Sequence, residues 1–299
     1  MASMTTAERR GYSQICGRDG AMMVIACDQR GGMRQVLAAT ASAREAISND
    51  TLGLVKADIT AYLARHAGAV LVDPLCAVPM LVDDGIIAPS TGLIIGLDAS
   101  GFDKTPEGWR ISNMVEGVTA RRVRELGGTA AKIMIYLRAD TPGANDANLA
   151  TLTRVVEDFA AEDVLLVVEF LTYALPDETP DAYKAAWPGL IEGGARLCLE
   201  AGAKVLKIPY PGTPQACANV TEMCGEVPWA VLSAGVDHET FVGQVETAMA
   251  NGASGVIAGR SLWKDCISLD RAVTRERLET IALPRLRELQ AVIARHFRR

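Results

Sequence analysis

Short apolar runs alternate with longer amphipathic segments along the whole chain. Eight of the runs are apolar on both faces and bounded by polar residues, a pattern typical of buried parallel strands. They cover residues 21–27, 69–72, 92–97, 131–136, 164–170, 204–209, 230–233 and 255–258. Helical patterns lie between most of them, over residues 43–65, 115–126, 148–161, 182–201, 240–250 and 271–297. The pattern predicts an α/β protein with a parallel sheet.

The number of strand–helix units favours a closed barrel. Eight such units in about 250 residues are typical of a (β/α)8 TIM barrel. No Pro/Ser-rich linker or block of charge divides the chain, so we expect a single domain over residues 1–299. Residues 1–18 are expected to form a lead-in segment, and residues 271–299 are expected to hold a closing C-terminal helix.

A doubly wound open sheet is the structural alternative to the barrel. Such a sheet usually has a glycine-rich turn after its first strand, because that turn binds a dinucleotide phosphate. The corresponding turn here reads Asp28-Gln-Arg-Gly-Gly-Met33 and is not a GxGxxG fingerprint. The sequence therefore favours the barrel and gives no sign of a dinucleotide cofactor.

A lysine inside one apolar run is the first candidate for chemistry. The chain has 7 lysines against 23 arginines, and Lys207 lies in the segment KVLKIPY from Lys204 to Tyr210. Burial of an ammonium is costly and favours the neutral amine, which can attack a ketone and form a Schiff base. Side-chain alternation places Lys207 on the same face as Val205, toward the barrel interior, and Lys204 on the opposite face. The structural alternative is that Lys207 extends from a strand end to solvent.

Further polar side chains lie at the ends of other predicted strands, where barrel enzymes hold their active sites. They are Asp28, Gln29 and Arg30 after the first strand; Lys132, Tyr136 and Arg138 of the fourth; Glu169 of the fifth; Ser233 and Gly235 after the seventh; and Gly259 and Arg260 after the eighth. Alternate strands contribute to the same interior layer, so Lys132 can approach Lys207, and a second cation would favour the neutral amine further. As structural alternatives, Asp28 could cap a helix and Glu169 could be an ion-pair partner.

The residues after strands seven and eight indicate a phosphate site. Barrels often bind phosphate there through backbone N–H groups and a helix N-terminus. Ser233, Gly235 and Gly259 would allow a close approach of the backbone, and Arg260 could add a bidentate contact. The alternative is that these residues only shape turns, cap a helix and place a charge on the surface.

Bulk composition narrows the class of protein. A content of 49% hydrophobic and 22% charged residues is ordinary for a globular protein, and a net charge of −6 argues against a general nucleic-acid binder. Seven cysteines without a CxxC pair favour reduced thiols in a cytoplasmic protein, with Cys27 and Cys76 as small core residues. The sequence contains no run of about 20 apolar residues, so we expect no membrane span. The first residues lack the apolar core of a signal peptide.

Eight collinear segments carry a resemblance to a known family. They are VIACDQRGGMRQVL from Val24, AVLVDP from Ala69, GFDKTPEG from Gly101, GGTAAKIMIY from Gly127, LVVEFLTY from Leu166, AGAKVLKIPYP from Ala201, VLSAGVD from Val231 and GASGVIAGRSLW from Gly252. As a set they resemble the class I (Schiff-base) aldolases of the tagatose 1,6-bisphosphate aldolase family. That group also includes the sulfofructose-phosphate aldolases.

The resemblance implies a role for each candidate. Lys207 matches the Schiff-base lysine, Glu169 the general acid/base, and Lys132 and Asp28 the residues that handle substrate hydroxyls and the carbinolamine. Ser233, Gly235, Gly259 and Arg260 match the phosphate-binding groups, and Gln29, Arg30, Tyr136 and Arg138 are expected to contact substrate. Arg138 looks more like the sulfosugar enzymes, whereas residues 101–108 look more like the tagatose enzymes, so the distal end of the substrate stays open.

The implied activity is that of a lyase. It would cleave a tagatose or fructose 1,6-bisphosphate-like ketose to dihydroxyacetone phosphate and a three-carbon aldehyde. One alternative substrate is 6-deoxy-6-sulfofructose 1-phosphate, which would give sulfolactaldehyde. The rival functions are those of a non-catalytic sugar-phosphate-binding barrel, an isomerase and a metal-dependent aldolase. A homo-oligomer is expected, with no nucleic-acid or membrane partner.

The number and positions of the histidines argue against a metal-dependent aldolase. A metal-dependent aldol site normally needs several histidine ligands. The chain has His66, His238 and His296, and none lies at a predicted strand end. We therefore expect no metal and no cofactor.

Overall fold

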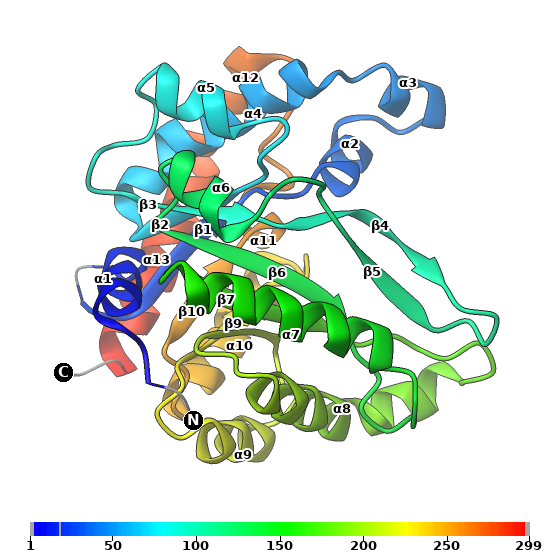
Figure 1. Ribbon diagram of the computed structural model, residues 1–299. Helices are drawn as coiled ribbons and strands as arrows, with labels where there is room; N and C mark the ends of the chain where they lie inside the picture. The colour runs from blue at the N-terminus through cyan, green and yellow to red at the C-terminus, as the bar shows by residue number, and fades with distance from the viewer. Residues whose placement is uncertain (1–2, 18, 297–299) are drawn as a thin grey trace.

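Eight parallel strands close into a barrel at the centre of the molecule (Figure 1). The computed structural model describes residues 3–17 and 19–296. The barrel strands are β1 (Met22–Ala26), β2 (Ala69–Val72), β3 (Gly92–Gly96), β6 (Ala130–Tyr136), β7 (Leu165–Leu171), β8 (Leu206–Pro209), β9 (Trp229–Leu232) and β10 (Gly255–Ala258). Their order around the barrel is β1-β10-β9-β8-β7-β6-β3-β2. The predicted (β/α)8 barrel is confirmed, and each predicted strand run coincides with one of these strands.

Helices surround the barrel and connect successive strands (Figure 1). They are α1 (Thr6–Ile15), α2 (Gly31–Leu37), α3 (Ala41–Glu45), α4 (Asn49–Leu63), α5 (Val78–Asp83), α6 (Ala120–Glu125), α7 (Asp146–Ala161), α8 (Pro180–Glu200), α9 (Pro214–Cys224), α10 (His238–Ala250), α11 (Arg260–Trp263), α12 (Arg271–Arg277) and α13 (Leu283–His296). A 3₁₀ turn follows α4 over Ala64–His66, and a π-helical turn joins α12 to α13 over Leu278–Ala282.

Three predicted helices differ from those observed. The pattern over 43–65 is divided into α3 and α4, because Ser48 starts a new helix and accepts a hydrogen bond from the Thr51 N–H at 3.1 Å. The closing helix over 271–297 contains a π-helical turn at Leu278–Ala282, and its predicted last residue, Phe297, lies outside the described residues. The helix predicted over 115–126 is observed as the shorter α6, and helices α2, α5, α9 and α11 were not predicted.

Helix α1 covers the amino-terminal end of the barrel, within the segment predicted only as a lead-in. Its Ile15 belongs to the apolar cluster that fills the barrel interior together with Val24, Leu71 and Val205. Lys204 donates from Nζ to both carboxylate oxygens of Glu8 in α1, at 2.7 Å each. Lys204 therefore serves to anchor this helix at the base of the barrel, on the side away from Lys207.

A β-hairpin that was not predicted extends from the carboxyl end of the barrel (Figure 1). It consists of β4 (Asp98–Lys104) and β5 (Arg110–Met114), which pair antiparallel. Asn148 of α7 fixes it to the barrel: Asn148 accepts from the Ser112 N–H at 2.9 Å and donates to the carbonyl oxygens of Arg110 at 2.8 Å and Tyr136 at 2.7 Å. One buried amide thus joins α7, β5 and β6.

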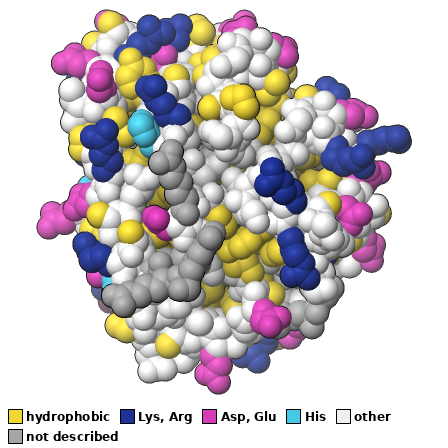
Figure 2. Space-filling model, turned by 90° about the vertical axis from the view of Figure 1, so that its left-hand side faces the viewer, with side chains coloured by type: hydrophobic (Ala, Val, Ile, Leu, Met, Phe, Trp, Pro, Cys, Tyr) yellow, Lys and Arg dark blue, Asp and Glu magenta, His cyan; other side chains and the backbone are white. Residues whose placement is uncertain are grey.

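The surface at the amino-terminal end of the barrel, away from the hairpin, carries both basic and acidic side chains. Figure 2 shows the side of the molecule on which α1 lies, with basic and acidic side chains spread among apolar ones and not gathered into one charged field. Among the helices of the described residues, none combines the length and the apolar character needed to cross a membrane.

Candidate active site

Four of the predicted residues meet inside the carboxyl half of the barrel. Nζ of Lys207 lies 2.9 Å from Oε2 of Glu169, and the same carboxylate oxygen lies 3.1 Å from Nζ of Lys132. Lys132 also lies 2.8 Å from Oδ2 of Asp28, which follows β1. Lys207, Lys132 and Glu169 are buried. The structure therefore brings the two lysines and two of their acids into one cluster.

The strand register explains this meeting. Glu169 of β7 pairs with Lys207 of β8, and Met134 of β6 pairs with Glu169. Lys132 lies two residues before Met134 and so points to the same side of the strand. Its long side chain can reach from one layer of the barrel interior to the next, where Glu169 lies.

Asp98 belongs to the cluster and was not predicted. It begins β4, separated from the end of β3 by Leu97, and its Oδ1 lies 2.6 Å from Nζ of Lys132. The Lys132 ammonium is therefore surrounded by three carboxylates, those of Asp28, Asp98 and Glu169. Burial acts to lower the pKa of Lys132, but these three negative charges outweigh burial and hold that pKa well above its ordinary value. Lys132 stays charged at neutral pH.

The two aspartates on Lys132 differ in their titration. Burial acts to raise the pKa of Asp28, but the charges of Lys132 and Lys207 outweigh it and the pKa is lowered. Burial raises the pKa of Asp98, and repulsion from Asp28 and Glu169 adds to the rise despite the attraction of Lys132. Asp28 is thus the more firmly ionised of the two.

The geometry changes one expectation about Lys207. The sequence suggested that Lys132 acts on Lys207 as a second cation. Instead, Oε2 of Glu169 lies between the two Nζ atoms, at 3.1 Å from Lys132 and 2.9 Å from Lys207. The nearest charge to Lys207 is therefore a carboxylate, which is placed to accept or return a proton.

A cavity of about 160 Å³ joins this cluster to the predicted phosphate site. Its lining includes Lys207 and Glu169 of the cluster, Gln29 after β1, and Ser233, Gly259 and Arg260 of the predicted phosphate site. The Gly259 N–H donates to Oγ of Ser233 at 3.3 Å. Nη2 of Arg260 donates to the Ala234 carbonyl at 3.4 Å, a long contact that leaves most of the guanidinium available.

Gly235 allows Arg260 to lie close to the backbone. Its φ of +83° lies in the region that favours glycine. A Cβ at this position would lie 3.2 Å from Cζ of Arg260, closer than the guanidinium could accept without moving. A side chain at position 235 would therefore strain the backbone and push the Arg260 guanidinium by a few tenths of an ångström.

Arg30 and Arg138 are bound to protein groups. Arg30 donates to the Asp98 carbonyl at 2.8 Å and lies 3.7 Å from Asp73, which also pairs with the fully buried Lys56. All five N–H groups of the Arg138 guanidinium are taken by Asp140, Glu178 and the Tyr173 carbonyl, at 2.6 to 3.0 Å. A substrate anion at Arg138 would have to displace two carboxylates.

The cysteines near strand ends are buried. Burial raises the pKa of Cys27 to about 12 and that of Cys76 to about 11. Both thiols are protonated at neutral pH, as expected of small core residues. In residues 3–17 and 19–296, no group of three or more His, Cys, Asp or Glu side chains is arranged to hold a metal ion.

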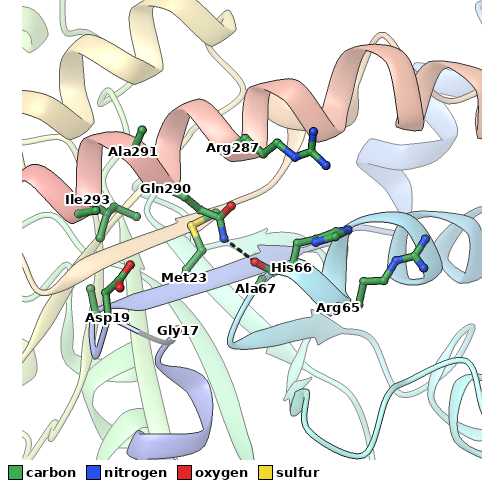
Figure 3. Close-up of a pocket in the computed structure, with 12 residues that line it drawn as sticks. Gly17, Asp19, Met23, Arg65, His66, Ala67, Arg287, Gln290, Ala291 and Ile293 are labelled. Carbon is green, nitrogen blue, oxygen red and sulfur yellow. Dashed lines mark hydrogen bonds between the residues drawn. The ribbon is translucent and has the colours of Figure 1, made fainter.

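A larger cavity, of about 500 Å³, lies at the other end of the barrel (Figure 3). It is bordered by the start of β1, by Arg65 and His66, and by Arg287 and Gln290 of α13. Gln290 donates to the His66 carbonyl at 2.5 Å. Because barrel enzymes place their chemistry at the carboxyl ends of the strands, we locate the active site at the smaller cavity.

Comparison with known proteins identifies the family. Residues 22–265 match the DeoC/LacD family aldolase profile. The chain is 27% identical over 287 residues to tagatose 1,6-diphosphate aldolase 1 of Streptococcus pyogenes serotype M1, covering 86% of this chain and 85% of that protein. It is 24% identical over 323 residues to tagatose 1,6-diphosphate aldolase of Staphylococcus epidermidis, covering 97% of each.

A solved structure shares the fold. A Schiff-base-forming fructose 1,6-bisphosphate aldolase superposes with a TM-score of 0.65 at 20% identity, covering 95% of this chain and 98% of the other. The family match spans well over half of the sequence and includes both lysines and all of their acids. The protein is therefore a member of the DeoC/LacD family of aldolases, and so a carbon–carbon lyase.

Proposed function

We propose that the protein is a class I aldolase in which Lys207 forms a Schiff base with the C2 carbonyl of a ketose 1-phosphate. One observation supports this more than any other. A single cavity is lined both by a buried lysine paired with a carboxylate and by a Ser/Gly/Arg set suited to phosphate. A phosphate held there would place the adjoining carbons beside Lys207.

The first steps are the formation and dehydration of a carbinolamine. Nζ of Lys207 adds to C2, and the carbonyl oxygen becomes a hydroxyl group. Glu169, 2.9 Å from Nζ, takes the proton released by the amine and returns one to the hydroxyl, which leaves as water. Lys132 contacts three carboxylates, those of Asp28, Asp98 and Glu169, and would exchange one of these contacts for a substrate oxygen during these transfers.

Cleavage then separates C3 from C4. A base removes the C4 hydroxyl proton, C4 becomes an aldehyde carbon, and the electron pair of the C3–C4 bond moves toward the iminium nitrogen to give an enamine. Glu169 is the first candidate for this base, and Asp28 for orienting the hydroxyl. Protonation at C3 and hydrolysis release dihydroxyacetone phosphate and free Lys207.

The names of the relatives support the substrate class. Two relatives are named for tagatose 1,6-diphosphate and the structural neighbour for fructose 1,6-bisphosphate. We therefore propose a ketose 1,6-bisphosphate or a ketose 1-phosphate of similar shape as substrate. Its C1 phosphate would contact Ser233, Gly235, Gly259 and Arg260.

Borohydride trapping tests this proposal. Reduction in the presence of dihydroxyacetone phosphate is expected to fix an adduct on Lys207, identified by peptide mass spectrometry. Lys204→Arg is the matched control, because Lys204 lies on the same strand segment but pairs with Glu8 outside the barrel interior. Trapping should persist in that variant and disappear in Lys207→Arg. An adduct confined to Lys132 or Lys204, or none at all, would contradict the proposal.

We also propose that the chain forms a homo-oligomer. Exposed apolar side chains lie on or beside α4 and two helices that contact it: Leu54 of α4, Val82 of α5 and Leu269 before α12 are 38%, 46% and 54% exposed. Size-exclusion chromatography with light scattering gives the mass in solution. A charged substitution such as Leu54→Glu is expected to shift it toward the monomer, and a monomeric wild-type protein would contradict the proposal.

A further inference from the structure

Arg110 lies at the carboxyl end of the barrel within a set of aromatic rings. It is the first residue of β5, and its Cζ lies 4.3 Å from the ring centre of Phe102 and 5.1 Å from those of Tyr136 and Tyr173. Tyr136 ends β6 and Tyr173 follows β7. Arg110 is thus held over the same end of the barrel that contains Lys132 and Glu169.

The charge of Arg110 is not neutralised by the protein. Across the described ranges, no carboxylate lies within ion-pair distance of its guanidinium, and none of its side-chain N–H groups donates to a protein acceptor. Arg138 and Arg30, at the same end of the barrel, are both paired with carboxylates. Aromatic rings stabilise a guanidinium through its charge and do not use its N–H groups as carboxylates do. The donors of Arg110 therefore remain available to a ligand.

The backbone of Arg110 is fixed. Its carbonyl accepts from Asn148 Nδ2 at 2.8 Å, and the same amide nitrogen donates to the Tyr136 carbonyl at 2.7 Å. The hairpin position that carries the charge is therefore tied to the end of β6. An arginine held by rings and backbone in this way loses little conformational entropy when it binds a ligand.

Arg110 and Arg260 lie on opposite sides of the barrel mouth. Arg110 contacts the end of β6, and Arg260 directly follows β10. In the order β1-β10-β9-β8-β7-β6-β3-β2, β6 is four strands from β10 in either direction, which is the opposite position in an eight-stranded barrel. Lys207 of β8 is two strands from each. This order puts one arginine on each side of Lys207 around the barrel mouth, the arrangement that a substrate with an anion at both ends would need.

We propose that Arg110 binds an anionic group on the distal carbon of the substrate and makes the enzyme select ketose 1-phosphates that carry a second anion. This inference rests on the proposed function. The distal group would be a phosphate ester or a sulfonate, since both present tetrahedral oxygens that suit the planar fork of an arginine. Arg110 is then a specificity residue, separate from the residues that break the carbon–carbon bond.

Three substrates of the fructose series test this proposal, because they differ only at C6. They are fructose 1,6-bisphosphate, 6-deoxy-6-sulfofructose 1-phosphate and fructose 1-phosphate, which has a neutral hydroxyl. Arg110→Met is expected to lower kcat/KM for the preferred anionic substrate roughly 10- to 150-fold, the loss of one charge-assisted hydrogen bond. It should leave kcat/KM for fructose 1-phosphate unchanged. Arg110→Lys should restore part of the loss. Whichever of the two anionic substrates the wild-type enzyme cleaves with the higher kcat/KM shows whether the distal group is a phosphate or a sulfonate.

Two control variants define the interpretation. Arg260→Met should lower kcat/KM for all three substrates, because all carry the C1 phosphate. Arg121→Met removes an exposed arginine of α6 that pairs with Glu125 and should change none of them. Equal losses on all three substrates with Arg110→Met would show that Arg110 only supports the hairpin, and would overturn the proposal. If the Met variant does not fold, the comparison of Arg110→Lys with wild type on the three substrates decides in the same way.

Failure of the proposed function gives a different result. If wild type cleaves none of the three substrates, calorimetry still measures their binding. Arg110→Met should then weaken binding of an anionic substrate and not that of fructose 1-phosphate. Equal affinities of wild type for the three ligands would overturn the inference about Arg110, whatever the outcome of borohydride trapping at Lys207.

Discussion

Asp28 and Asp98 contact the same ammonium group, that of Lys132, at 2.8 Å and 2.6 Å, yet their pKa values move in opposite directions. Both carboxylates are largely shielded from solvent, which disfavours their ionised forms. Asp28 is compensated by Lys132 and also by Lys207. Asp98 is attracted by Lys132 but repelled by Asp28 and Glu169. Two aspartates therefore contact one lysine, and Asp98 binds a proton more tightly than Asp28 does.

This difference predicts opposite effects on stability. The lowered pKa of Asp28 means that its ionised form contributes stability above about pH 4, which is lost as the pH falls through the folded-state value. The raised pKa of Asp98 means that stability is lost as the pH rises from about 4 through its folded-state value. At pH 7, Asp28→Asn should therefore lower the free energy of unfolding by roughly 1–3 kcal/mol, and Asp98→Asn should lower it less or raise it. Urea unfolding at pH 7 measures both; a larger loss for Asp98→Asn would refute the prediction.

Glu169 is expected to act as a proton carrier and not only as an ion-pair partner. Glu169→Gln keeps the size and the hydrogen-bonding oxygen but removes proton transfer. We predict a fall in kcat of roughly 10²- to 10⁴-fold, with slower Schiff-base trapping and a melting temperature close to wild type. Steady-state kinetics and thermal unfolding check this. A lower melting temperature with near-normal kcat would instead assign Glu169 a structural role and move the acid/base function to Asp28 or Tyr136.

Arg260 is expected to hold the C1 phosphate. Arg260→Ala removes a charged donor worth roughly 1.5–3 kcal/mol, which corresponds to a loss of about 10- to 150-fold in kcat/KM. Folding should be little affected, because the side chain makes one long hydrogen bond to Ala234 and no ion pair within the described residues. An unchanged kcat/KM, or a phosphate ester bound elsewhere in a crystal, would contradict this assignment.

Activity is expected to survive exhaustive chelation. The proposed iminium accepts the electrons of the broken bond, so the reaction needs no metal ion as electron sink. EDTA treatment followed by dialysis should leave kcat unchanged. Loss of activity that a divalent ion restores would favour a metal-dependent aldolase.

The sequence was sufficient to predict the barrel and the facing of its lysines. Both follow from short-range pattern, since strands buried on both faces read as apolar runs and their side chains alternate. Lys207 points inward to Glu169, and Lys204 points outward to Glu8, as parity required. Asp98 and Asp73 give the same signal as Asp28, an acid directly after an apolar run, and attention to strands two and three would have found them.

The pairing of Arg138, the hairpin and the position of Arg110 depend on contacts between distant segments, which the sequence pattern does not reveal. The partners of Arg138 include Glu178, 40 residues away, and only the fold shows that its donors are already used. The hairpin was missed because residues 98–114 lack a clear apolar alternation. Arg110 was missed because its aromatic neighbours Phe102, Tyr136 and Tyr173 come from three separate segments, which only the fold brings together.

The attachment of the hairpin has a consequence for how this enzyme can change. Lys207, Glu169 and Lys132 belong to the barrel strands, whereas β4 and β5 are an insertion between β3 and β6 that Asn148 and Ser112 fasten to the barrel. The first residue of the hairpin, Asp98, contacts Lys132, whereas Arg110 pairs with Lys104 at the far end of the hairpin. If Arg110 selects the distal group as proposed, substitutions on the hairpin beyond Asp98 change which sugar is accepted without moving Lys207. Substrate preference can therefore diverge through mutation of a few hairpin residues while the chemistry is inherited intact, which makes this hairpin the natural target for redesigning the enzyme.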